Sequence, residues 1–209
     1  MSTILLLSTA RFLMNNPPEV LGRPFNTFKM VHITTASKGV SDTAYFERNR
    51  KFFKEHNYDC TEIDLDHTTG DDLKKVLEKT ELVYVEGGNT FLLMKSIRQS
   101  GFEKIIKELL PKGLIYMGAS AGSYVACPTI EMALWKHQDK YSHYNLTDLT
   151  AMSLVPFLMT VHYKPEYDQI LKEKISQTPL PVKILTDEQG ILMRDGKVEL
   201  IGKGDEIIL

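Results

Sequence analysis

The chain has 209 residues, 43% of them hydrophobic, which is enough for a single domain over residues 1–209 with an ordinary core. Its 25 Lys and Arg and 27 Asp and Glu give a net charge of −2 without a run of like charges, which argues against nucleic acid as a partner. No apolar stretch approaches about 18 residues, and the first residues lack the basic leader and long apolar core of a signal peptide. We therefore expect a cytoplasmic protein without a membrane partner.

In the first two thirds of the chain, short apolar runs alternate with amphipathic stretches. The expected strands are residues 3–7, 30–34, 60–65, 82–86 and 114–118. The expected helices begin at Ser41 and Gly70 and cover residues 90–99 and 101–110. This alternation is typical of βαβ units. The sequence predicts a doubly wound α/β fold, with a mostly parallel sheet and helices on both of its faces.

Two further segments differ from this pattern. After about residue 180 come short, partly alternating runs at 182–186, 191–194, 197–201 and 206–209, and Asp195-Gly196 is a hairpin signal, so we expect a C-terminal antiparallel extension. Segment 128–152 has no sustained period and is interpreted either as a lid that contacts substrate or as a plain surface excursion. It contains Trp135, His137, Tyr141, His143 and Tyr144.

The two cysteines, Cys60 and Cys127, are too few for a disulfide framework. They also lack the CxxC or Cys/His spacing that could build a zinc site. We interpret both as buried, unreactive thiols and expect neither a metal ion nor an organic cofactor.

A candidate nucleophile lies in residues 118–122, which read Gly-Ala-Ser-Ala-Gly, a G-x-S-x-G pattern at the end of an apolar run. A serine exposed at a sharp strand-to-helix turn needs nearly bare neighbours, so that strand and helix can approach each other. Such a turn directs the amide of Ala121 toward the group that Ser120 attacks, where negative charge develops. The alternative is a turn rich in Gly and Ala that serves only close packing.

A second amide donor is offered by residues 86–90, Glu-Gly-Gly-Asn-Thr. They follow the strand expected beside that of Ser120 and lead into a helix, so Gly88 can present its amide without a side chain in the way. The alternative is a Gly-Gly turn that only caps the following helix, which would have the same sequence.

A serine hydroxyl needs a base, and histidine suits that task at neutral pH. Of the six histidines we favour His162, because it follows the apolar run 154–159 and precedes a helix expected near Pro165, on the edge of the sheet where Ser120 lies. A carboxylate should then hold the imidazole in the right tautomer. Asp187 and Glu188, in the turn after 182–186, are both candidates.

These motifs resemble peptidase E and its relatives, the serine peptidases of family S51, which include cyanophycinase. The resemblance rests on residues 87–90, on 118–122 with 125–130, and on 154–157 leading to His162. It implies a fold similar to class I glutamine amidotransferase domains, with a serine nucleophile and a triad in the chain order Ser, His, Glu.

Applied to this sequence, the resemblance assigns the nucleophile to Ser120, the base to His162 and the orienting acid to Glu188, with Asp187 as the alternative acid. It also assigns the oxyanion hole to the amides of Gly88 and Ala121. Asn89 corresponds to a residue that lines the substrate pocket.

Two departures from peptidase E concern its preference for a P1 aspartate. Trp135 stands where peptidase E has an aspartate implicated in activity, and residues 164–174 lack the arginine suited to a P1 carboxylate. These departures leave the expected peptidase chemistry in place, but they remove the cation on which a preference for Asp over Asn would depend. Candidate replacement cations are Lys164, Arg11 and His137.

The sequence thus predicts a serine-type peptidase that hydrolyses small peptides through an acyl-enzyme on Ser120, as a monomer or homodimer. The alternatives within the enzyme class are an amidase, an esterase or a cyanophycinase-like isopeptidase. The alternative outside it is a non-catalytic domain that binds a small ligand.

Overall fold

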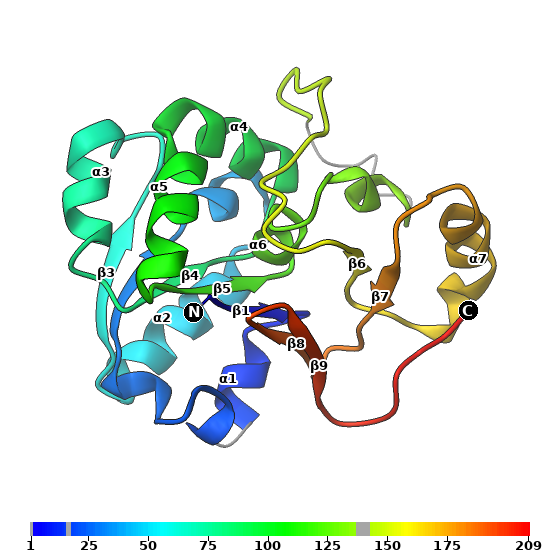
Figure 1. Ribbon diagram of the computed structural model, residues 1–209, viewed down its shortest axis with the longest axis horizontal. Helices are drawn as coiled ribbons and strands as arrows, with labels where there is room; N and C mark the ends of the chain where they lie inside the picture. The colour runs from blue at the N-terminus through cyan, green and yellow to red at the C-terminus, as the bar shows by residue number, and fades with distance from the viewer. Residues whose placement is uncertain (1, 16–17, 137–142) are drawn as a thin grey trace.

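The computed structural model describes residues 2–15, 18–136 and 143–209, and its centre is a seven-stranded sheet in the order β3-β2-β4-β5-β1-β8-β9 (Figure 1). The strands from β3 to β1 are parallel, β8 runs antiparallel to β1, and β9 runs antiparallel to β8. Their bounds are β1 Thr3–Leu7, β2 Lys29–Ile33, β3 Asp59–Ile63, β4 Leu82–Val85, β5 Ile115–Ala119, β8 Gln189–Arg194 and β9 Lys197–Gly202. The predicted doubly wound α/β fold is confirmed.

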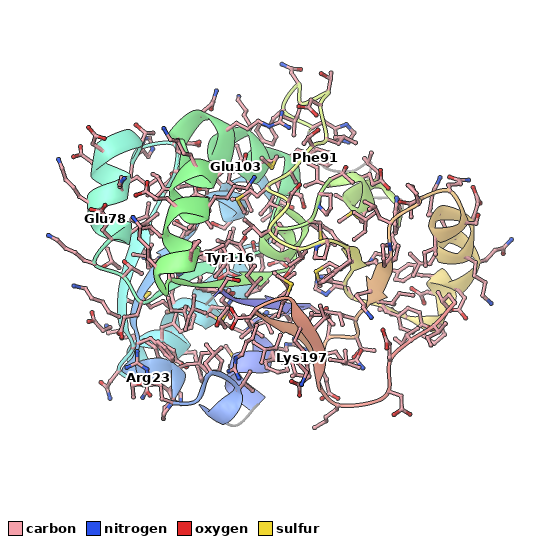
Figure 2. All side chains as sticks on the ribbon, viewed as in Figure 1. Arg23, Glu78, Phe91, Glu103, Tyr116 and Lys197 are labelled. Carbon is pink, nitrogen blue, oxygen red and sulfur yellow. The ribbon has the colours of Figure 1, made fainter. Side chains whose placement is uncertain are left out.

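Helices cover both faces of the sheet (Figure 1). They are α1 Arg11–Asn15, α2 Ala44–Glu55, α3 Gly70–Leu77, α4 Thr90–Ser100, α5 Phe102–Leu109, α6 Ala121–Tyr124 and α7 Asp168–Ser176. Successive side chains along a strand point to opposite faces, so Ile4 and Leu6 pack with α3, α4 and α5, while Leu5 and Leu7 pack with α1 and α2. This double burial explains why the strands are apolar runs rather than alternating ones. Figure 2 shows the fully buried Tyr116 inside the molecule.

The C-terminal region is antiparallel only in part. The Asp195-Gly196 hairpin joins β8 to β9 as predicted, and φ angles of 48° and 82° at these two residues suit the tight turn. Strand β7 (Val182–Ile184) instead pairs in parallel with β6 (Leu158–Thr160), in a separate two-stranded sheet. Residues 206–209 form no strand, because the chain leaves the sheet after Gly202.

The segment 128–152 packs against the core over much of its described length. A 3-10 turn at Glu131–Leu134 buries Met132 and Ala133, and Trp135 and Met152 are buried beside them. None of the described residues of this segment lines the cavity at Ser120. His137 and Tyr141 lie outside the described residues. Within the described part of the chain, no helix combines the length and apolar character needed to cross a membrane.

Candidate active site

Ser120 lies at the turn between β5 and α6, with φ 49° and ψ −108°. A positive φ in a residue other than glycine costs about 1–3 kcal/mol and persists only where the surroundings impose it. Here the Ser120 amide donates to the Leu7 carbonyl at 3.0 Å. A Cβ on Gly118 would lie 2.4 Å from the Gly122 carbonyl oxygen, and one on Gly122 would lie 2.1 Å from that of Val85. The glycines of the motif therefore permit the close approach that the sequence predicts, and Ser120 stays partly exposed.

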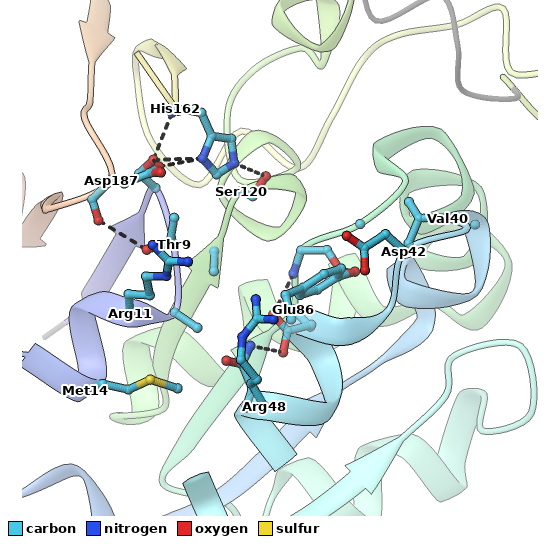
Figure 3. A pocket seen from close by; sticks show the side chains of 18 of the residues that line it. Thr9, Arg11, Met14, Val40, Asp42, Arg48, Glu86, Ser120, His162 and Asp187 are labelled. Atoms are coloured by element: carbon cyan, nitrogen blue, oxygen red, sulfur yellow. Dashed lines mark hydrogen bonds and ion pairs between the residues drawn. The ribbon is translucent and has the colours of Figure 1, made fainter. Parts of the chain in front are cut away.

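His162 follows β6 and also has a positive φ, of 55°. Its Nε2 lies 3.1 Å from the Ser120 Oγ, within hydrogen-bonding distance. The structure thus brings these two residues together, although their strands belong to different sheets. Figure 3 shows the imidazole directed toward the serine hydroxyl.

The carboxylate that contacts His162 is Asp187, and the prediction that Glu188 makes this contact is wrong. Asp187 Oδ1 lies 2.6 Å from His162 Nδ1 (Figure 3). The Glu188 side chain is 60% exposed, and its Oε1 lies 3.7 Å from Lys203 Nζ. Both residues lie in the turn before β8, which the Gln189 N–H closes by donating to the Thr186 carbonyl at 3.2 Å, and in this turn only the first carboxylate faces the imidazole.

Ser8 is a site residue that the sequence analysis missed. It directly follows β1, which lies beside β5, and its side chain is buried. Its Oγ donates to Asp187 Oδ1 at 3.0 Å and accepts the backbone N–H of His162 at 2.9 Å. Ser8 therefore fixes the acid and the base relative to each other. A serine placed directly after a buried strand at the carboxyl edge of the sheet was the available signal.

The pKa of the Asp187 carboxyl is held below its usual value, first by the hydrogen bond from His162. The electrostatic interaction with His162, the Ser8 hydroxyl and the charge of Arg11 lower this pKa further, against the opposing effect of partial burial. Asp187 is therefore ionised at neutral pH and can accept the Nδ1–H of His162.

The backbone amides of Gly88 and Ala121, close to Ser120, have no acceptor among the described residues. Ala121 is the first residue of α6, where no carbonyl of the helix can reach its N–H. Gly88 has φ 141°, and a Cβ there would lie 2.3 Å from the Ala36 carbonyl oxygen, so only glycine fits. Since backbone amides in folded proteins are normally paired, two unpaired N–H groups beside a candidate nucleophile point to an external acceptor.

In the structure, the Asn89 side chain has a structural role at the start of α4. Its side chain is fully buried, and its Oδ1 accepts the N–H groups of Phe91 and Leu92, each at 2.9 Å. It thus caps the N-terminus of α4. Asn89 is not among the described residues that line the cavity at Ser120, and its contact with substrate stays a prediction.

The three side chains Ser120, His162 and Asp187 border a cavity of about 1030 Å³. On one side of it lie Arg11 and Met14 from α1; on the other lie residues of α2 and the loop before it (Figure 3). The residues from this second side include Val40, Ser41, Asp42, Tyr45, Arg48 and Asn49. A volume of this order is sufficient for a small peptide.

The structure is thus an α/β protein whose doubly wound sheet carries a Ser-His-Asp contact chain at its carboxyl edge, beside a cavity, and such a contact chain is typical of hydrolases. The family model described as "Peptidase family S51" matches residues 5–201. The chain belongs to this family and is a peptidase.

Individual relatives agree with this assignment. An uncharacterized peptidase of Pasteurella multocida is 31% identical over 168 residues, which cover 78% of this chain and 80% of the relative. A Drosophila melanogaster protein described as a probable alpha-aspartyl dipeptidase is 32% identical over 145 residues, which cover 64% of this chain and 58% of that protein.

Among solved structures, a Listeria monocytogenes protein provisionally named peptidase E superimposes with a TM-score of 0.83 at 24% sequence identity. The match covers 98% of this chain and 100% of the other. At this level of identity the likeness concerns the fold.

Proposed function

We propose that this peptidase is of the serine type and cleaves small peptides through an acyl-enzyme formed on Ser120. The observation that carries the proposal is the continuous chain of contacts from the Ser120 hydroxyl through His162 to Asp187, at 3.1 Å and 2.6 Å. In this arrangement the base can take the serine proton while the carboxylate holds the imidazole in the required tautomer.

The reaction has two halves. Ser120 Oγ attacks the peptide carbonyl carbon as its proton passes to His162 Nε2, and the amides of Gly88 and Ala121 donate to the oxygen that becomes negative. His162 then gives the proton to the leaving nitrogen, the C–N bond breaks, and an ester on Ser120 remains. Water attacks this ester with His162 as base, and the proton returns to Ser120 Oγ as the acid product leaves.

Two arginines of the cavity can bind an anionic group of the substrate, although the carboxylates of Asp42, Glu86 and Asp187 line the same cavity. Four of the six arginines have acceptors: Arg23 on Glu81, Arg50 on Glu62, Arg98 on Asp148 and Arg194 on the Val20 carbonyl. The other two, Arg11 and Arg48, make no ion pair or hydrogen bond with any described residue, and both line the cavity. A guanidinium binds a carboxylate well, so a peptide with an acidic first residue fits this cavity.

In this arrangement the cation comes from α1 or α2. The family resemblance instead places it in the helix after the histidine. Helix α7 (Asp168–Ser176), which occupies that position, contains lysines but no arginine. The Drosophila relative's description as an alpha-aspartyl dipeptidase supports the same substrate class for that protein.

A substrate panel tests the charge preference. Dipeptides beginning with Asp, Asn or Ala are compared by kcat/KM in the wild type and in Arg11→Gln, Arg48→Gln and the control Arg50→Gln, which changes an arginine of α2 that is paired outside the cavity. Loss of one charge-assisted hydrogen bond is expected to lower kcat/KM for the Asp dipeptide about 10- to 100-fold, with little change for the Ala dipeptide.

The control variant should behave as wild type on all three dipeptides. Equal kcat/KM for the Asp, Asn and Ala dipeptides in the wild type would contradict the charge preference. Cleavage of simple esters without cleavage of any dipeptide would instead indicate an esterase.

A further inference from the structure

The hydroxyl of Tyr45 reaches from α2 to the turn that joins β4 to α4, and it donates to the Gly87 carbonyl oxygen at 2.9 Å. Two backbone N–H groups of this turn are also held. The Gly87 N–H donates to Glu86 Oε1 at 3.1 Å, and the Asn89 N–H donates to the Ala36 carbonyl at 2.9 Å. The Gly88 N–H is the donor of this turn that remains without an acceptor among the described residues.

The orientation of that N–H depends on Tyr45. In a trans peptide the carbonyl and the following N–H point in opposite directions, and the described residues contain no cis peptide bond. By fixing the Gly87 carbonyl, Tyr45 therefore also fixes the direction of the Gly88 N–H. If this peptide rotated, a carbonyl oxygen would replace the N–H and would repel a developing oxyanion.

The peptide between Gly87 and Gly88 has little resistance of its own to such a rotation. The two dihedral angles that change are ψ of Gly87 and φ of Gly88, and a residue without Cβ has the widest range of both. An external contact is therefore needed to select one orientation, and the Tyr45 hydroxyl provides it on the carbonyl side.

On the other side of the turn, the anchor is the buried carboxylate of Glu86, which is 2% exposed. Its Oε2 accepts from Asn49 and lies 3.0 Å from His32 Nε2, and its Oε1 accepts from Tyr84 and from the Gly87 N–H. Described residues therefore contact both oxygens of this carboxylate. Glu86 holds the Glu86–Gly87 peptide through the Gly87 N–H, whereas Tyr45 holds the Gly87–Gly88 peptide through the Gly87 carbonyl.

We propose that Tyr45 is a positioning residue, which holds the Gly87–Gly88 peptide so that the Gly88 N–H can donate to the oxyanion. This inference rests on the proposed function, because it requires that Ser120 form a tetrahedral intermediate. The hydrogen bond from the Gly88 N–H to the substrate oxygen acts only when charge develops on that oxygen. Tyr45 therefore contributes to kcat and leaves ground-state binding unchanged.

The test compares Tyr45→Phe with wild type, with Tyr58→Phe as the matched control and with Ser120→Ala. Tyr58 packs against Phe52 and Phe53 of α2, away from the cavity, so its change removes a hydroxyl from the same region without touching the turn. The measurements are kcat and KM on a dipeptide, and the affinity for a peptide boronate, which forms a tetrahedral adduct with an active-site serine.

For Tyr45→Phe, kcat is expected to fall roughly tenfold, the equivalent of one net hydrogen bond, with KM unchanged. Affinity for the boronate should fall in the same proportion, and Tyr58→Phe should match wild type in both. If kcat and boronate affinity are unchanged, or if only KM rises, Tyr45 does not position the amide. If Ser120→Ala keeps full activity, the proposed function itself fails.

Discussion

Replacing Ser120 with alanine is expected to lower kcat about 10⁶-fold for any dipeptide that the wild-type protein cleaves. The reason is that the variant has no nucleophile within reach of His162, while the remaining groups can only bind and polarise the substrate. His162→Ala should lose about as much, and the double variant should lose little more than either single variant, because the two side chains act as one unit. Steady-state kinetics at saturating substrate measures all three.

The fold should survive these changes. Ser120 is partly exposed, and its structural contacts are made by its backbone N–H and C=O, which alanine keeps. The melting temperature of Ser120→Ala should therefore stay near that of wild type. Ser176→Ala, at an exposed serine on α7, is the matched control and should keep full activity. Substantial dipeptide cleavage by Ser120→Ala would contradict the assignment of the nucleophile.

The second large effect concerns the acid. Asp187→Asn is expected to lower kcat about 10⁴-fold, because an amide cannot stabilise the imidazolium and its NH₂ favours the wrong tautomer of His162. Glu188→Gln should stay within about twofold of wild type, since its carboxylate is exposed and its nearest partner is Lys203.

The two variants change neighbouring residues in the same turn by the same chemistry, so each controls for the other. Parallel kcat measurements at one pH decide between them. A large loss in Glu188→Gln with an active Asp187→Asn would restore the acid that the family resemblance implies, and would show that the contact at 2.6 Å has no part in the reaction.

Most of the sheet was predictable because its strands are buried on both faces and read as short apolar runs. The predicted strand 3–7 matches β1, and the other four expected strands differ from β2, β3, β4 and β5 by one or two residues at their ends. Helix α1 has five residues, too few for a helical period to show, and it was missed. Residues 182–186 have the pattern of a strand, but the pattern does not specify that β7 pairs with β6.

The candidate site was predictable where a motif dictates local backbone geometry. The G-x-S-x-G turn needs bare neighbours, and a Gly-Gly pair before a helix can present an amide without a side chain in the way, so Ser120, Gly88 and Ala121 could be proposed from these motifs. The choice between Asp187 and Glu188 depends on one residue of register in a turn, which no periodicity encodes.

The residues that were missed act through contacts between distant parts of the chain. Ser8 meets Asp187 across 179 positions of sequence, and Tyr45 meets Gly87 across 42. For Asn89, the family resemblance implies a place in the substrate pocket, whereas its position before an apolar helix also marks a helix cap. A single sequence does not reveal whether such a residue contacts substrate or caps a helix.

Covalent labelling of Ser120 tests the central claim most directly. The protein is treated with a fluorophosphonate, and the adduct is counted by intact mass and located by peptide mapping. We expect one adduct per chain, on Ser120, absent from Ser120→Ala and formed far more slowly in His162→Ala. An adduct on another residue, or an unlabelled protein that still cleaves dipeptides, would contradict the account.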